Sequence, residues 1–285
     1  MLYTVRHMLG NLEVHNALVS LIVGRTSVMI FAIVIGIIVI YFLATTKRDN
    51  LPKVRRLAGL DAIKEAVGRA VETGRPVHFT PGWTERQLYT GGSGGSGGAA
   101  DILAGMSVLS YLARTVADYG SRLIVTLGSA ELVPMAGEIV RNGYMAAGKA
   151  DAFKPEDIIF FSSDQFAYAA GVMGLVKREQ IAANVMVGPF LAESLLFAEA
   201  AYQVGSIQVA GTPSVFQTPF FVAVCDYVLI GEECYAAGAL LSEDPHQLGS
   251  IRGTDISKVL VVAILLVGVL LSVLGSKVVV QLLKT

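Results

Sequence analysis

Two long apolar runs without a charged residue lie near the ends of the chain, at residues 28–44 and 259–275. Flanking hydroxyl residues extend the first to residues 27–46, about 30 Å of helix at about 1.5 Å per residue, which is enough to cross the hydrocarbon core of a bilayer. A helix is favoured over a strand because it satisfies its own backbone polar groups in lipid. The second run has a lysine at each end, whose side chain can reach the headgroups. We therefore expect two transmembrane helices, the second over residues 258–276.

Two other interpretations of these runs are a cleaved signal peptide and a buried core helix. The first run begins late, lacks a small-residue cleavage site and is followed by Lys47 and Arg48, which argues against a signal peptide. The second lacks a polar face, which favours a membrane span. Lysine and arginine are more frequent just after the first run than before it, so the segment that follows is expected to be cytoplasmic. The sequence thus predicts an inner (plasma) membrane protein with two spans and both termini outside.

The two terminal segments are short. In residues 1–26, apolar residues recur near helical spacing with polar residues between them, which indicates an amphipathic helix on the membrane or against a neighbouring subunit. Its His7 and His15 are interpreted as interfacial polar residues rather than metal ligands. Residues 277–285 are expected to form a tail.

Between the two runs, short apolar stretches alternate with longer stretches of helical periodicity. A linking segment, residues 47–75, is largely helical. Strands are expected at residues 76–80, 122–127, 157–162, 183–187, 206–210 and 220–230, and helices at 99–119, 130–147, 165–178, 192–204 and 232–241. This alternation predicts βαβ units and a mostly parallel sheet, and the continuously apolar strands predict helices on both faces. Right-handed crossovers then give a doubly wound, Rossmann-like α/β domain, a three-layer sandwich over residues 76–250.

Composition adds constraints on partners. Hydrophobic residues make up 53% of the chain and charged residues 16%, with 22 Lys and Arg against 23 Asp and Glu, so no basic field favours nucleic acid. Cys225 and Cys234 have no CxxC spacing, which excludes a disulfide scaffold and favours two buried thiols in a reducing compartment. Because a free monomer usually carries more surface charge, the charge-poor central domain predicts subunit contacts and a homo-oligomer.

The run GGSGGSGG at residues 91–98 matches the GxGxxG pattern in the frame Gly92, Gly94, Gly97. Low-complexity Gly/Ser sequence matches it by composition alone. A dinucleotide fingerprint also needs a tight strand-to-helix turn and an acidic residue after the second strand, and both are missing. Three interpretations stay open: a flexible loop or linker, native or engineered; an anion-binding loop at the next helix N-terminus; and a subunit contact.

The carboxyl edge of the predicted sheet is where a ligand would bind. The candidate ligand-binding residues at this edge are Thr80, Ser129, Asp164, Glu193 and Thr212. Together with Glu131, the two acids among them offer a carboxylate cluster for a cation or for acid–base chemistry. The favoured interpretation is that each acid instead complements the dipole of a helix N-terminus.

Other chemistry-bearing residues give weaker signals. His78 lies inside an apolar strand and is interpreted as a satisfied or edge histidine rather than a catalytic one, and His246 as a solvent-facing turn residue. The sequence has no GxSxG motif, no Walker loop and no zinc-like Cys/His spacing. It therefore assigns no catalytic residue, no cofactor and no metal ligand.

Four sequence segments resemble those of a known family: FAYAAGVMG at 166–174, AESLLFAEA at 192–200, IQVAGT at 207–212 and PFFVAVCDYVLIGEECYAAGA at 219–239. In these the chain resembles a family of uncharacterised prokaryotic membrane-anchored proteins, classed as a domain of unknown function, with a Rossmann-like cytoplasmic domain. The resemblance covers most of residues 77–249 and implies no activity, cofactor or catalytic residue. The Gly/Ser run departs most from the family.

These observations predict a membrane-anchored, self-associating scaffold or an accessory subunit of a larger membrane assembly, without assigned catalysis. Its expected partners are the lipid bilayer, further copies of the chain and other membrane proteins. The alternative is an enzyme or sensor that binds a nucleotide or small anion at the carboxyl edge of the sheet. A transport accessory is a third possibility, which would require several copies to enclose a pathway.

Overall fold

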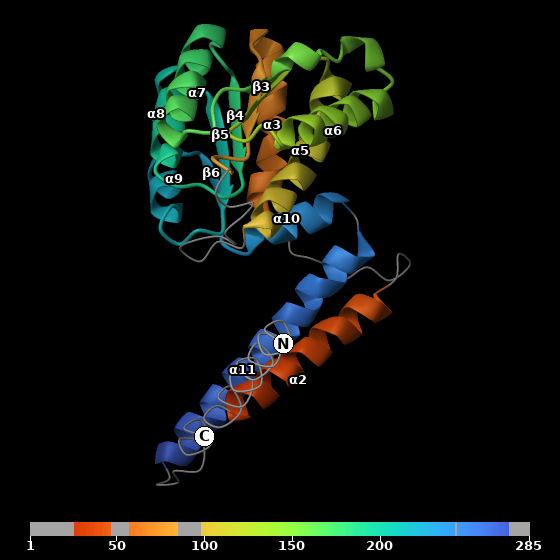
Figure 1. Ribbon diagram of the computed structural model, residues 1–285, viewed down its shortest axis with the longest axis vertical. Coiled ribbons are helices and arrows are strands. Elements are labelled where there is room, and N and C mark those ends of the chain that lie inside the picture. The colour runs from red at the N-terminus through yellow and green to blue at the C-terminus, as the bar shows by residue number, and fades with distance from the viewer. Residues whose placement is uncertain (1–25, 47–56, 85–97, 243, 274–285) are drawn as a thin grey trace, which may run out of the picture. The chain divides into compact units, whose positions relative to one another are not determined.

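The computed structural model describes residues 26–46, 57–84, 98–242 and 244–273. The predictions for residues 1–25, for the tail at 277–285 and for most of the Gly/Ser run lie outside these described residues. The chain divides into two compact units, shown together in Figure 1. Residues Lys53–Asp244 form one unit, and the segments Met1–Pro52 and Pro245–Thr285 form the other.

The first unit, which we call the α/β unit, alternates strands and helices as the periodicity predicts. Its strands are β1 (Val77–Thr80), β2 (Leu123–Leu127), β3 (Ile158–Phe160), β4 (Ala183–Val187), β5 (Ile207–Thr212) and β6 (Tyr227–Ile230). Its α-helices are α3 (Ala58–Thr73), α5 (Ala99–Tyr119), α6 (Leu132–Ala146), α7 (Gln165–Glu179), α8 (Glu193–Gln203), α9 (Thr218–Val224) and α10 (Glu233–Ser242), and two short 3-10 turns, Ala150–Ala152 and Pro155–Asp157, precede β3.

The six strands form one sheet in the order β3-β2-β1-β4-β5-β6, and every neighbouring pair is parallel. This confirms the prediction of an α/β fold with a parallel sheet. The order is that of doubly wound dinucleotide-binding domains, in which the chain reverses its direction of travel across the sheet between β1 and β4. The reversal point is called the switch point below.

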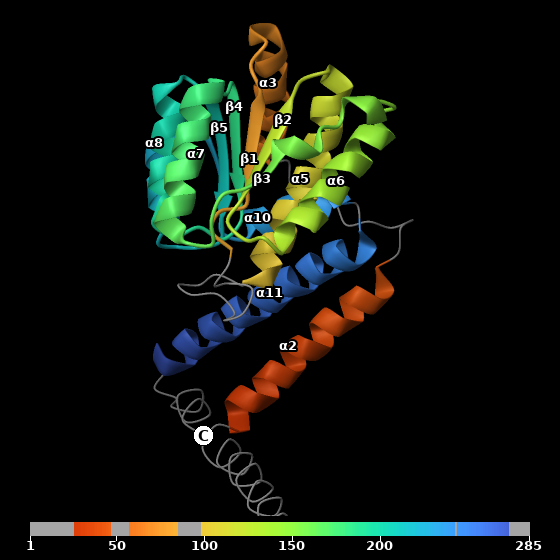
Figure 2. The same ribbon diagram turned by 45° about the horizontal axis from the view of Figure 1, so that its top comes forward.

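Helices cover both faces of the sheet and bury two separate cores. On one face, α3, α5, α6 and α10 enclose a large apolar core that includes Val77 and Phe79 of β1. On the other face, α7, α8 and α9 enclose a smaller core around Tyr168 and Phe197. Figures 1 and 2 show α7 and α8 on the side of the sheet opposite α5 and α6. The predicted three layers are present.

One predicted strand is partly wrong. The run at residues 220–230 is not a single strand: its first part belongs to helix α9, and only Tyr227–Ile230 forms β6. A short apolar run cannot separate helix from strand by its pattern. The helix forms because Pro219 lies in its first turn, where a missing N–H costs no bond, and because Phe221 is buried edge-on against Phe190, with ring centroids 5.1 Å apart.

The second unit, which we call the helix pair, contains α2 (Thr26–Thr45) and α11 (Pro245–Val273). The two helices approach closely at Gly249 and Gly253, four residues apart. A Cβ on Gly253 would lie 2.9 Å from Val39 Cα, and one on Gly249 would lie 2.8 Å from the carbonyl oxygen of Phe42. The two contacts advance along α11 as they retreat along α2, so the helices are antiparallel. Small residues at this spacing let helix backbones pack closely in membrane proteins.

Only α11, over Pro245–Leu271, is long and apolar enough to cross a membrane among the described residues, and the apolar stretch of α2, Met29–Thr45, is shorter. The helix begins well before residue 258, where the predicted span starts. Its first turns are polar, with Arg252, Asp255 and Lys258 preceding the apolar part. A membrane location is therefore weakly suggested by α11, and the second predicted span, at α2, stays a prediction.

Candidate functional site

The loops after β1 and β4 touch each other at the switch point. Gly82 has φ +81° and Gly188 has φ +152°, backbone angles that side chains rarely adopt. A Cβ on Gly82 would lie 2.5 Å from the carbonyl oxygen of Pro189, and one on Gly188 would lie 2.5 Å from that of Pro81. In dinucleotide-binding domains the ligand lies in the crevice between these two loops. In this protein the backbones of the two loops are in contact at that place.

Glu193 joins the same two loops from the first turn of α8. Its side chain is fully buried. Oε1 accepts hydrogen bonds from the backbone N–H of Trp83 at 3.0 Å and of Leu191 at 3.1 Å, and Oε2 accepts one from Gln165 Nε2 at 2.5 Å. Backbone N–H groups at such a place bind phosphate in nucleotide-binding domains. Here a carboxylate of the chain occupies them.

Trp83 brings the ends of two further strands to this point. Its indole Nε1 donates to the carbonyl oxygen of Ser163, after β3, at 2.7 Å. Gly128, directly after β2, lies against its ring, since a Cβ there would be 3.2 Å from Trp83 Cδ1. The loops after β1, β2, β3 and β4 therefore meet around one tryptophan, the single one in the sequence.

Thr80, the last residue of β1, faces into the domain. Its Oγ1 lies 2.5 Å from the hydroxyl of Tyr168 and accepts a hydrogen bond from Gly82 N at 3.1 Å. The Tyr168 hydroxyl donates to the carbonyl oxygen of Thr126 at 3.1 Å. Burial raises the pKa of Tyr168, so the phenol stays protonated and keeps this donor role. Thr80 is thus fully engaged in internal contacts.

Asp164 is the N-cap of α7. Its carboxylate accepts hydrogen bonds from the N–H groups of Phe166 at 3.1 Å and Ala167 at 2.9 Å. For this acid the predicted helix-terminus role is confirmed. Glu131 stands at the corresponding position of α6 without a side-chain capping bond. Within the described residues, no group of three or more His, Cys, Asp and Glu side chains is placed to hold a metal ion.

The remaining two candidates, Ser129 and Thr212, differ in their contacts. Thr212 Oγ1 accepts a hydrogen bond from Ser214 N at 3.3 Å and shapes the turn after β5. Ser129 is buried after β2, and its Oγ has no hydrogen-bond partner among the described groups. The same holds for Oγ1 of Thr84, which follows the switch-point loop and is also buried.

A row of buried polar side chains crosses the sheet beneath this edge. His78 lies beside Asn184 in the parallel pairing of β1 with β4, and Asn184 beside Gln208 of β5. His78 Nδ1 donates to Asn184 Oδ1 at 2.7 Å, while its Nε2 accepts from Thr126 Oγ1 at 2.9 Å. Asn184 Nδ2 donates to Gln208 Oε1 at 3.4 Å, and Gln208 Nε2 to the carbonyl oxygen of Ala198 at 2.9 Å. The prediction that His78 is a satisfied histidine is confirmed.

Burial lowers the pKa of His78 from 6.5 to about 4, although the hydrogen bond with Asn184 opposes this shift. The imidazole is therefore neutral at pH 7, as its one donor and one acceptor role require. A neutral, fully paired imidazole inside the sheet has no contact with solvent. It acts in the structure rather than in proton transfer with a ligand.

Both cysteines are free thiols. Cys234 is buried against Gly211, and Cys225 is half-buried. Burial raises the pKa of Cys225 to about 12 and raises that of Cys234 as well. Because the thiolate is the reactive form, neither cysteine is activated as a nucleophile.

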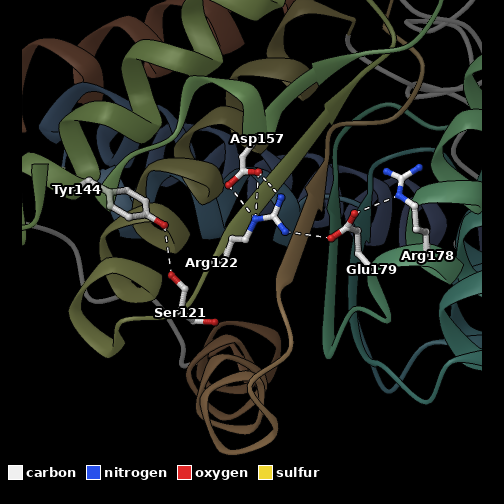
Figure 3. A network of polar contacts seen from close by, with 6 residues as sticks. All are labelled: Ser121, Arg122, Tyr144, Asp157, Arg178 and Glu179. Atoms are coloured by element: carbon white, nitrogen blue, oxygen red, sulfur yellow. Dashed lines mark hydrogen bonds and ion pairs between the residues drawn. The ribbon is translucent and has the colours of Figure 1, made fainter. Parts of the chain in front are cut away.

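A cluster of ion pairs lies at the opposite, amino edge of the sheet (Figure 3). Arg122, before β2, binds Asp157 with Nη2 to Oδ1 at 2.6 Å, and its Nη1 binds Glu179 Oε2 at 3.0 Å. Hydrogen bonds to Asp157 raise the pKa of Arg122, and those from Arg178 and Arg122 lower the pKa of Glu179. The arrangement joins β2, β3 and the end of α7, and it stabilises that edge.

Sequence reasoning missed several residues of the carboxyl edge and the polar row. They are Trp83, Thr126, Tyr168, Asn184 and Gln208. One signal was available for three of them: Thr126, Asn184 and Gln208 are single polar residues inside otherwise apolar strands. A continuously apolar strand buried on both faces has no need of such a residue. The contacts of Trp83 had no comparable signal.

The sequence as a whole matches a known protein family. A family described as "Domain of unknown function (DUF6754)" matches residues 18–283. The chain belongs to this family. The DUF6754 match spans α2, the whole α/β unit and α11. Searches among curated proteins and among solved structures found no match.

Proposed function

We propose that this DUF6754 protein is a membrane-anchored, non-catalytic scaffold or accessory subunit, with a Rossmann-like domain that does not use the usual ligand crevice. The observation that carries the proposal is the set of contacts that the chain makes with itself at the switch point. Glu193 takes up the backbone N–H groups of Trp83 and Leu191, and Gly82 and Gly188 bring the two loops into contact. A nucleotide phosphate would have to displace a buried, hydrogen-bonded carboxylate.

The helix pair supports the membrane part of the proposal. Away from their glycine contact, α2 and α11 expose large apolar side chains, which lipid would cover. These exposed residues include Ile30, Ile33, Ile37, Ile40, Val259, Val262, Leu265, Leu266, Val269 and Leu270. We propose that α11 spans the bilayer and that α2 forms a second span beside it.

The two apolar stretches are staggered along the pair. Val39 lies opposite Gly253, so the C-terminal end of the α2 stretch is level with the first turns of α11. Along the α11 axis, that level lies about 16 Å from the start of the charge-free part of α11, at about 1.5 Å per residue. Arg252 lies in this interval with its guanidinium 5.5 Å from the ring centroid of Phe42. The polar turns of α11 therefore lie beside the apolar stretch of α2, and the long Arg252 side chain, which packs on Phe42, can extend from there toward the headgroups.

Flanking charge supports an orientation. Lys47, Arg48, Lys53, Arg55 and Arg56 follow the first helix, against two arginines before it. By the positive-inside rule the α/β unit lies in the cytoplasm and both termini lie outside, in an inner (plasma) membrane.

Self-association is the part of the proposal that rests on composition. A chain with only 16% charged residues suits a surface partly covered by other copies. Mass measurement of the full chain in mild detergent tests it, with subtraction of the bound detergent. We expect a discrete oligomer whose mass is unchanged on dilution within the micromolar range. A monomer at every concentration would overturn this part of the proposal.

One observation favours the alternative of a nucleotide-binding or anion-binding enzyme or sensor. Two buried hydroxyls without described partners, Thr84 Oγ1 and Ser129 Oγ, follow the adjacent strands β1 and β2. A thermal-shift panel of ATP, NAD, phosphate and Mg²⁺ on the full chain separates the two functions. The scaffold predicts no stabilisation by any of them. Stabilisation that is lost in Thr84→Val and Ser129→Ala, and kept in the control Thr73→Val, would favour the alternative.

A further inference from the structure

Large apolar side chains gather at the carboxyl edge of the α/β unit. They stand at the N-terminal ends of α7 and α8, in the loop after β5 and on α9, and these three helices pack side by side. The exposed residues are Phe166, Leu195, Val215, Phe216, Phe220 and Val222. We call this set the edge patch. Val215 is 72% exposed and Phe216 is 69% exposed, so they are its most prominent members.

The loop that carries Val215 and Phe216 is fastened from the inside. The carbonyl oxygen of Ser214 accepts hydrogen bonds from Gln217 N and Thr218 N, both at 3.1 Å, and from Thr218 Oγ1 at 2.9 Å. Gln217 Oε1 accepts another from Ser194 Oγ of α8 at 2.7 Å. The polar groups of the loop thus bond inward, and its two large apolar residues remain outside. A loop held in this way can bind a surface through its apolar side chains without the loss of conformational entropy that ordering a mobile segment would cost.

Both connections of the α/β unit to the apolar helices leave from this same edge. Helix α3 precedes β1 and runs against the strands, so it starts at the carboxyl edge, where Gly59 lies against Leu229 near the end of β6. Helix α10 crosses the first turns of α5: the Tyr235 hydroxyl donates to Asp101, and Gly238 lies against Ala104. Helix α10 ends at Ser242 and α11 begins at Pro245.

We propose that the edge patch is a membrane-contact surface, with Val215 and Phe216 inserted at the boundary between headgroups and acyl chains. The inference rests on the proposed membrane anchoring. Helix α11 begins three residues after α10 ends, so the carboxyl edge is tied directly to the helix that is proposed to span the bilayer. Apolar and aromatic side chains at that depth are removed from water and gain stability with the area they bury. The partner is the bilayer in which the chain is anchored.

Site-specific fluorescence on the full chain in phosphatidylcholine nanodiscs tests this proposal. Single cysteines, Val215→Cys and Phe216→Cys, are introduced into a Cys225→Ala, Cys234→Ala background and labelled with nitrobenzoxadiazole. The controls are Tyr119→Cys and Met145→Cys, which are about half exposed and lie at the opposite edge, where α5 and α6 end. We expect blue-shifted emission and several-fold stronger quenching by nitroxide-labelled lipid at positions 215 and 216 than at the controls.

The possible results are distinct. Labels at 215 and 216 that behave like the controls would overturn the membrane contact. So would self-quenching between copies without lipid quenching, because the patch would then be an interface between chains. Retention of the protein in membranes after an alkaline wash tests the anchoring separately. Loss of retention overturns the proposed anchoring, whereas retention with solvent-exposed labels overturns this inference alone.

Discussion

The two faces of the sheet are built on different principles. Toward α3, α5, α6 and α10 the strands send apolar side chains such as Val77 and Phe79 into one large core. Toward α7, α8 and α9 the same strands send apolar side chains such as Met186 into the smaller core. Beside them lie His78, Asn184 and Gln208, which bond to one another inside the protein. The first face gains stability from the burial of apolar area, and an apolar core of this kind tolerates many combinations of side chains of similar volume. The second requires each polar group to find its partner, so it fixes the register of β1, β4 and β5.

The largest loss of stability is expected when a large apolar side chain is removed from the apolar face. Phe79→Ala is expected to lower the free energy of unfolding by about 3–5 kcal/mol, because it removes a fully buried ring and leaves a cavity. Denaturant unfolding followed by Trp83 fluorescence reports the α/β unit. Phe166→Ala, at an exposed position, is the control and should change stability by less than about 0.5 kcal/mol. Equal effects of the two substitutions would contradict the described core.

The polar face should make the protein sensitive to pH. Below about pH 6.5 the unfolded chain protonates His78, while the folded protein does not until about pH 4. The contribution of His78 is therefore fully present above pH 6.5 and falls by about 1.4 kcal/mol per pH unit below it, about 3 kcal/mol in all.

The control for this dependence is His78→Gln, which cannot titrate in the same range. Denaturant unfolding at pH 7, 5.5 and 4.5 should show the wild-type protein losing its advantage over the variant as the pH falls. A constant difference between the two proteins at all three values would mean that His78 is not buried in its neutral form.

Removal of one member from the polar row should cost nearly as much. Asn184→Leu leaves the Nδ1–H of His78 and the Oε1 of Gln208 without their strong partners, and we expect a loss of about 2–3 kcal/mol. Gln203→Leu, at an exposed position on α8, is the matched control and should be nearly neutral. A stabilising effect of Asn184→Leu would contradict this expectation, because it would mean that apolar contacts, and not the hydrogen bonds of the polar row, stabilise this face.

The smallest expected effect compares one hydroxyl from each face. Tyr168→Phe removes bonds to Thr80 and Thr126 on the polar face and should cost about 1–1.5 kcal/mol. Tyr144→Phe, on the apolar face, removes a single long bond of 3.4 Å to Ser121 and should cost about 0.5 kcal/mol or less. Thermal unfolding midpoints of the two variants provide the comparison. A larger loss of stability in Tyr144→Phe than in Tyr168→Phe would contradict the view that hydrogen bonds matter more on the polar face.

Much of the fold could be predicted from local pattern. Helix α5 was predicted at its observed bounds and β4 likewise, because each has a clear apolar period and turn residues at both ends. The predicted strand at 220–230 was partly wrong because Phe221 turns toward Phe190, a contact that local periodicity does not contain. The start of α11 at Pro245 was missed because its first turns are polar, although they continue the helix without a break.

The candidate site was predicted less well than the fold. The rule for parallel sheets placed Thr80, Ser129, Asp164, Glu193 and Thr212 at one edge, where the structure has them. Their roles needed contacts between distant segments: Glu193 bonds to the backbone of Trp83, and Asp164 caps its own helix. The same carboxylate residue type therefore serves two different purposes, which composition and spacing cannot separate.

By itself the sequence determined the order of strands and helices, the parallel sheet and the two apolar runs, because each follows from the periodicity of neighbouring residues. Only the tertiary structure decided which polar groups meet. His78 and Asn184 are 106 residues apart and bond because the crossover places β4 beside β1. The same crossover brings the loops of Gly82 and Gly188 into contact and lets Glu193 bond to the backbone of Trp83. Pairings of this kind depend on long-range packing, and no local pattern encodes them.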